Sequence, residues 1–219
     1  MAQLILILFI CIMIPLFLSA ILFRGHSRLL IVFMMIGCYV CLFSGYLCGY
    51  LKDTFALDSF RMTYTINPLV EEIGKAIPII IYGRVFKPKR KELLECAMIV
   101  GIGFAILENT YYLISGIDTV TVVWAVIRGV GAGLMHGIAT MFVGWVLFYV
   151  NVRRRLALPG TIGTISVAIL YHGIYNMLIQ SPYQFIGIIL PLSTFIPIRI
   201  LYHKINRAEA LKNAALPHQ

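Results

Sequence analysis

The sequence predicts an all-α membrane protein, a bundle of about seven transmembrane helices with the N-terminus outside and the C-terminus in the cytoplasm. Apolar residues make up 60% of the 219 residues and charged residues only 12%, and the mean hydropathy is +0.91. Soluble domains carry about 25% charged residues, so this composition excludes a soluble protein. Seven apolar stretches and the alternating charge of their connections give the helices and their direction. We therefore expect a single integral membrane domain over residues 1–219.

Each apolar stretch is long enough to cross a hydrocarbon core of about 30 Å, which takes about 20 helical residues. No basic segment precedes the first stretch, so we expect a retained span rather than a cleaved signal peptide. The fifth stretch is longer than the bilayer requires, which predicts a tilted helix or one that extends beyond the membrane. We expect the helices at 4–23, 29–51, 68–86, 93–115, 121–150, 161–180 and 184–203.

The connections between these helices alternate in charge. The second connection has a net charge of zero, the fourth holds Asp118 alone and the sixth is uncharged. Cytoplasmic loops are enriched in Lys and Arg, so the first, third and fifth connections and the C-terminal tail are predicted to be cytoplasmic. The net charge of +9 then reflects membrane topology, and no nucleic-acid partner is expected. The basic residues of these segments are Arg24, Arg28, Lys87, Lys89, Arg90, Lys91, Arg153, Arg154, Arg155, Lys204, Arg207 and Lys212.

Four of the predicted helices carry polar side chains in the outer half of the membrane. At about 1.5 Å per residue, Glu108 lies roughly 10 Å and His172 roughly 12 Å below the outer ends of their helices. Each residue alone can be explained as an ion pair or an interhelical hydrogen bond. The whole set is costly in a membrane and therefore indicates a functional site. It comprises Glu71, Glu72, Lys75, Glu108, Asn109, Arg128, His136, His172 and Asn176.

Glutamate and histidine together are suited to the activation of water. An ionised carboxylate can remove a proton from water, and an imidazole can donate to a developing oxyanion. Lys75, one turn after Glu71, is expected to be its counter-charge. Asn176 is expected to orient His172 or to add an oxyanion donor. Arg128 is expected either to neutralise a carboxylate or to extend to the membrane surface.

The same residue types can bind a metal ion. Imidazole and carboxylate groups are zinc ligands, and Glu108, His136 and His172 are the candidates. The sequence has no H-E-x-x-H motif, and these residues have no diagnostic spacing. The preferred hypothesis therefore requires no cofactor, with zinc as the alternative.

The fifth predicted helix has a glycine every four residues, at Gly129, Gly133 and Gly137. Small residues at this spacing form a ridge that lets two membrane helices approach closely. We therefore expect a neighbouring helix to pack against this ridge.

Four motifs in chain order resemble the PrsW-type membrane proteases, relatives of the CAAX-processing and bacteriocin-processing (CPBP) intramembrane glutamate proteases. They are EEIGK at 71–75, GFAILEN at 103–109, GLMHGIAT at 133–140 and HGIYN at 172–176. The resemblance covers roughly 67–180, the predicted catalytic helices. The CAAX-processing branch has EExxxR and FxxxH where this sequence has EExxK and FxxxE, which favours the PrsW-type branch.

The resemblance implies a glutamic protease that cleaves a single-span protein within or near a bacterial or archaeal cell membrane. Glu71 would be the general base, Glu72 and Glu108 would shape the site, and His136 and His172 would polarise the substrate. The usual role in such proteins is site-1 cleavage of a membrane-anchored anti-sigma factor. An outer-leaflet site agrees with a first cut on the extracytoplasmic side.

Two other functions are compatible with these residues. One is a scaffold without catalytic activity, since the seven-span APH-1 subunit of gamma-secretase is a distant relative of the group. Retention of the complete Glu and His set favours an enzyme. The other is an ion-coupled transporter, where membrane Glu and His also occur. The clustering of polar groups on one side and the lack of a visible inverted repeat disfavour it.

Overall fold

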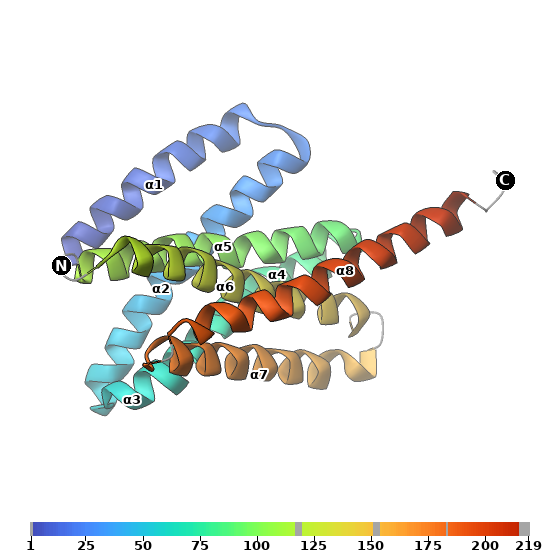
Figure 1. The fold of residues 1–219 in the computed structure, drawn as a ribbon. Coiled ribbons are helices and arrows are strands. Elements are labelled where there is room, and N and C mark those ends of the chain that lie inside the picture. The colour runs from blue at the N-terminus through green and yellow to red at the C-terminus, as the bar shows by residue number, and fades with distance from the viewer. Residues whose placement is uncertain (1, 117–119, 151–153, 183, 215–219) are drawn as a thin grey trace.

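The computed structural model describes residues 2–116, 120–150, 154–182 and 184–214, and every regular element in these ranges is a helix (Figure 1). The seven long helices correspond one to one with the seven predicted stretches, which confirms the all-α fold. A three-residue helix and a π-helix lie between the second and third of them. The elements are α1 Ala2–Leu22, α2 Gly25–Phe55, α3 Ser59–Arg61, η1 Met62–Ile66, α4 Asn67–Val85, α5 Arg90–Ser115, α6 Val122–Val150, α7 Arg154–Ile179 and α8 Ile186–Ala214.

Successive long helices run in opposite directions. Figure 1 shows that α1 begins at one end of the bundle and α8 ends at the other, as an odd number of crossings requires. Which end faces the cytoplasm stays a prediction from loop charge. Asp118 and Arg153, two of the residues used in that prediction, lie outside the described residues.

Five of the seven long helices are long and apolar enough to cross a membrane: α1, α2, α5, α6 and α7. In α8 the apolar part is shorter, Ile186–Ile200.

The charged side chains of α4 lower its average hydropathy, but Glu71, Glu72 and Lys75 face the protein interior. Its outer face is an apolar stripe with a residue at every fourth position, and this face can meet lipid. The crossing of the membrane by α4 therefore stays a prediction. The stripe consists of Leu69, Ile73, Ile77, Ile81 and Val85.

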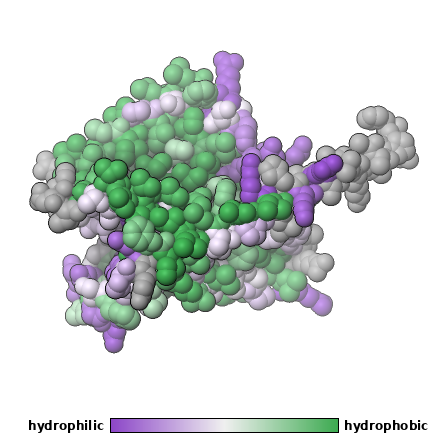
Figure 2. All heavy atoms as spheres, in the orientation of Figure 1, coloured by the Kyte–Doolittle hydropathy of each residue, from purple (hydrophilic) through white to green (hydrophobic). Residues whose placement is uncertain are grey.

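Hydrophobic side chains cover the visible surface between the two ends of the bundle, and hydrophilic ones gather toward those ends (Figure 2). This distribution is expected of a protein surrounded by lipid.

The centre of the bundle is formed by α5 and α6. In each of these two helices, 56% of the most apolar 18-residue stretch is buried. The corresponding share is 11% in α1, which packs mainly on α2. The largest core cluster joins α2, α4, α5, α6 and α7 through residues such as Phe33, Ile79, Val100, Val143 and Ala168. This core fixes the rotation of the helices that carry the polar residues.

The predicted glycine ridge on α6 is wrong for two of its three members. A Cβ atom at Gly129 or Gly133 would meet nothing within 4 Å, and one at Gly137 would make ordinary contacts from 3.5 Å. The close approach of α5 and α6 uses Gly101 instead, where a Cβ would lie 2.2 Å from the carbonyl oxygen of His136. A period of four residues shows which glycines share a face but not whether that face meets another helix.

Candidate active site

Lys75 lies at the centre of the polar cluster and is fully buried. Its Nζ donates to Oε1 of Glu72 and to Nδ1 of His136, each at 2.6 Å, and lies 4.6 Å from the ring centre of Phe104. The expected pairing of Lys75 with Glu71 is therefore wrong, because the ammonium bonds to the neighbouring glutamate. Glu71 is four residues and Glu72 three residues before Lys75, and both spacings bring a side chain to the adjacent turn of a helix. The sequence therefore could not show which glutamate bonds to Lys75.

The bond from Lys75 determines the protonation of His136. A charged ammonium can only donate, so Nδ1 of His136 accepts and Nε2 carries the ring hydrogen. That Nε2 lies 3.1 Å from Oε2 of Glu108, which accepts. His136 is thus held between a cation from α4 and a carboxylate from α5.

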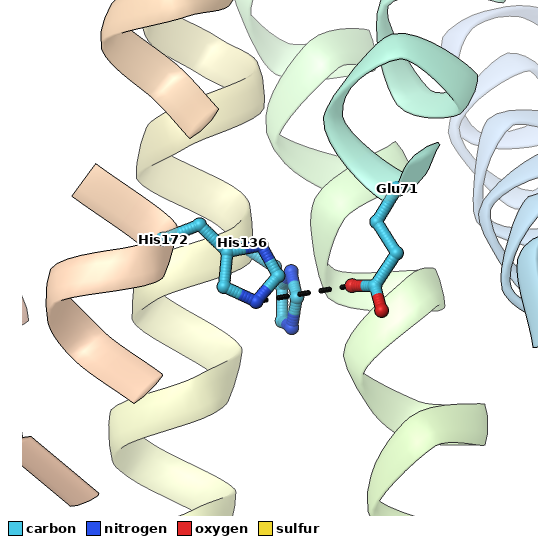
Figure 3. Close-up of side chains that lie close together, drawn as sticks. All are labelled: Glu71, His136 and His172. Carbon is cyan, nitrogen blue, oxygen red and sulfur yellow. Dashed lines mark ion pairs between the residues drawn. The ribbon is translucent and has the colours of Figure 1, made fainter. Parts of the chain in front are cut away.

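His172 has the opposite tautomer. Its Nδ1 lies 2.8 Å from Oε1 of Glu72, and because a carboxylate only accepts, Nδ1 carries the hydrogen. Nε2 therefore presents a lone pair, and it faces Oε2 of Glu71 at 3.8 Å (Figure 3). This oxygen of Glu71 is buried and has no hydrogen-bond partner among the described residues. Two electron-pair donors thus face each other across a space suited to a proton donor or a cation.

Arg128 neutralises a carboxylate, which is one of the two roles expected for it. Its Nη2 donates to Oε2 of Glu108 at 2.9 Å, and its guanidinium lies 4.3 Å from the ring centre of Tyr112. Asn109 holds it in place, because its Oδ1 accepts from Nε of Arg128 at 3.1 Å. Oε2 of Glu108 therefore accepts from both Arg128 and His136.

The side chain of Asn176 bonds to a backbone group of the π-helix rather than to His172, although both residues lie on α7. Its Nδ2 donates to the carbonyl oxygen of Thr63 at 3.0 Å, within the π-helix that leads into α4. Gly173 permits this approach, since a Cβ there would lie 2.9 Å from the carbonyl oxygen of Tyr64. A π-helix frees backbone carbonyls, and no sequence signal pointed to one at 62–66.

Three of the predicted residues could hold a metal ion together. Donor atoms of Glu71, His136 and His172 lie within 4.8 Å of one another (Figure 3). The candidate set from sequence named Glu108 in place of Glu71, but Glu108 is engaged by Arg128.

The donor chemistry at Glu71 and His172 fits zinc well. Each has an unpaired electron-pair donor atom facing the other, and the bond that Nδ1 of His172 donates to Glu72 is the usual support for a metal-binding histidine. His136 can join them only by giving up its bond to Lys75 or to Glu108.

A sequence model of a protein family, described as PrsW family intramembrane metalloprotease, matches residues 25–202. The match includes every residue of the cluster. No curated protein and no solved structure matches the chain.

Proposed function

Because the chain belongs to the PrsW family of intramembrane metalloproteases, we propose that it hydrolyses a peptide bond of a membrane-anchored protein at Glu71 and His172. The observation that carries this proposal is the pair of unshared donor atoms, Oε2 of Glu71 and Nε2 of His172, which are buried and lie 3.8 Å apart. A water molecule that bridges the two atoms from one side would be polarised by both.

Glu71 is the better base of the two adjacent glutamates. Oε1 of Glu72 already accepts from Lys75 and from His172, so its charge is used in hydrogen bonds. Among the described residues, Glu71 has no such ion pair within 3.5 Å, and it lines a cavity through which substrate can reach it. In this proposal Glu71 takes the proton from the attacking water, and the peptide nitrogen receives a proton as it leaves.

The remaining charged residues position this pair. Glu72 fixes the tautomer of His172, and Lys75 fixes that of His136. Glu108, which also accepts from Arg128, holds Nε2 of His136. His136, whose ring centre lies 4.8 Å from that of His172, could donate to a developing oxyanion only by giving up the bond of its Nε2 to Glu108.

A zinc ion would be held by Glu71, His172 and His136, where it would polarise the carbonyl group and activate water. The metal-free glutamate mechanism and the zinc-dependent one both require Glu71 and His172. They differ in their response to a chelator, and the experiment below separates them.

The expected substrate is a single-span protein cut near the outer leaflet, for which an anti-sigma factor is the proposed case. Supporting this, Glu71 lies one turn after the start of α4 and Glu108 lies seven residues before the end of α5, both toward the end of the bundle predicted to be outside. The assembled Glu and His cluster favours catalysis over a scaffold role. The position of these carboxylates toward one end disfavours a transporter.

The test is cleavage of single-span peptides by the purified protein in liposomes. Glu71→Gln and His172→Ala should each lower the rate at least a hundredfold, since general acid–base groups contribute about 10²–10⁴-fold. Glu95→Gln, a partly buried glutamate paired with His26 away from the cluster, is the matched control and should cleave normally. Unchanged cleavage by both site variants would sink the proposal. Loss on chelation, restored by zinc, would assign the metal-dependent mechanism.

A further inference from the structure

A cavity of about 400 Å³ lies between α2, η1, α4 and α5. Glu71 and Glu108 line it, so it is continuous with the polar cluster. The rest of its wall is largely apolar and aromatic, with Leu42, Tyr46 and Tyr111 among the lining residues. This volume lies at the lower end of the range of about 300–1,000 Å³ found for ligand sites.

One face of α2 forms a long wall of this cavity. The face runs from Cys41 to Lys52, which is roughly 16 Å at 1.5 Å per residue. Gly45 and Gly49 lie in the middle of it, and a Cβ atom at either would meet nothing within 4 Å. Gly37 on the same helix differs, because a Cβ there would lie 2.1 Å from the carbonyl oxygen of Val100. Helix packing therefore requires Gly37 but does not require Gly45 or Gly49.

The length of the cavity suits a short extended stretch of peptide. An extended peptide rises about 3.3 Å per residue, so roughly five residues fit this length. An extended backbone needs hydrogen-bond partners, and the cavity offers polar groups from η1 and the start of α4. Among them is Oδ1 of Asn67, a buried atom with no partner among the described residues.

We infer that this cavity binds an unwound segment of the membrane-anchored substrate beside the scissile bond, and that Gly45 and Gly49 determine specificity by leaving room for its apolar side chains. The inference rests on the proposed peptide hydrolysis. The substrate segment lies beside α2, with its backbone along the face that carries Gly45 and Gly49. The peptide bond that follows this segment reaches Glu71. Asn67 holds the backbone of the segment.

The first test fills the cavity. Gly45→Leu and Gly49→Leu should each lower kcat/KM for a single-span substrate at least tenfold, chiefly through a higher KM. The alanine variants should have smaller effects in the same direction. Gly163→Leu on α7 is the matched control, since a Cβ there also meets nothing within 4 Å and the residue lies outside the cavity. It should remain within twofold of the wild type.

The second test measures cross-linking rather than activity and does not use the glycine variants. It therefore remains informative if Gly45→Leu or Gly49→Leu fails to fold. Two proteins carry Glu71→Gln and retain a single cysteine, either Cys48 in the cavity or Cys11 on the exposed face of α1. A substrate with one cysteine near the cleavage site should form a disulfide with Cys48 under mild oxidation, and not with Cys11.

The outcomes separate the two claims. If the wild type cleaves and the Gly45 and Gly49 variants match Gly163→Leu, the inference is overturned while the protease proposal stands. Cross-linking to Cys11 alone would also overturn it. A wild type that cleaves no membrane-anchored substrate would instead count against the protease proposal.

Discussion

Nζ of Lys75 lies 2.6 Å from Nδ1 of His136, so a buried ammonium determines which nitrogen of that histidine carries its hydrogen. The same Nζ bonds to Glu72, which in turn determines the tautomer of His172. One cation on α4 thus prepares histidines on two other helices. This arrangement is rigid because all four side chains involved are buried, with no more than about 1% of each exposed. They are Glu72, Lys75, His136 and His172.

Replacement of Lys75 should destabilise the protein strongly. Lys75→Met leaves Glu72 buried without its cation, and breaking one partner of a buried pair costs about 3–5 kcal/mol. Thermal or denaturant unfolding in detergent measures the loss. The double variant Lys75→Met/Glu72→Gln should recover part of it, because the uncompensated charge is gone. Lys91→Met, which removes an exposed pair with Glu95 at 3.9 Å, should change stability by less than about 1 kcal/mol.

The helices and the membership of the polar cluster could be predicted from the sequence, whereas the partners within the cluster could not. Long apolar stretches give helix positions directly, and charges inside them identify a site. Which of Glu71 and Glu72 meets Lys75 depends on the rotation of α4 against α6 and α7. That rotation is set by core packing at residues such as Ile79 and Val143, which look like any other apolar residues in the sequence.

Asn176 should act at a distance from the reacting atoms. Asn176→Ala removes the hydrogen bond to the carbonyl oxygen of Thr63, which should cost about 1 kcal/mol of stability. The start of α4 would then be less firmly held, and kcat should fall with little change in KM. Gln180→Ala removes the exposed hydrogen bond between Tyr64 and Gln180 from the same region and should leave both constants unchanged. Equal effects of the two substitutions would show that Asn176 has no positioning role.

Zinc binding gives a test that does not require a substrate. We expect chelator-treated protein to bind zinc, and Glu71→Gln and His172→Ala to weaken it sharply. Glu72→Gln should also lower the affinity, by about 10–100-fold, because it removes the group that orients His172. Equilibrium dialysis with zinc measures the affinity, and Glu95→Gln should bind as the wild type does. Zinc bound equally by all of these variants would place the ion elsewhere.

Gly101 should prove essential where Gly133 is not. A Cβ at Gly101 would lie 2.2 Å from the carbonyl oxygen of His136, so Gly101→Ala must push α5 and α6 apart. Overpacking of this kind costs about 1–3 kcal/mol, and the shift would also move His136 away from Lys75 and Glu108. Gly133→Ala on α6 meets nothing within 4 Å, and as an alanine in a helix it should be neutral or stabilise by up to about 1 kcal/mol. Unfolding temperature and cleavage rate should therefore both fall for Gly101→Ala and hold for Gly133→Ala. Equal stability of the two variants would mean that the helices have room at Gly101 and that His136 is held by its side-chain bonds alone.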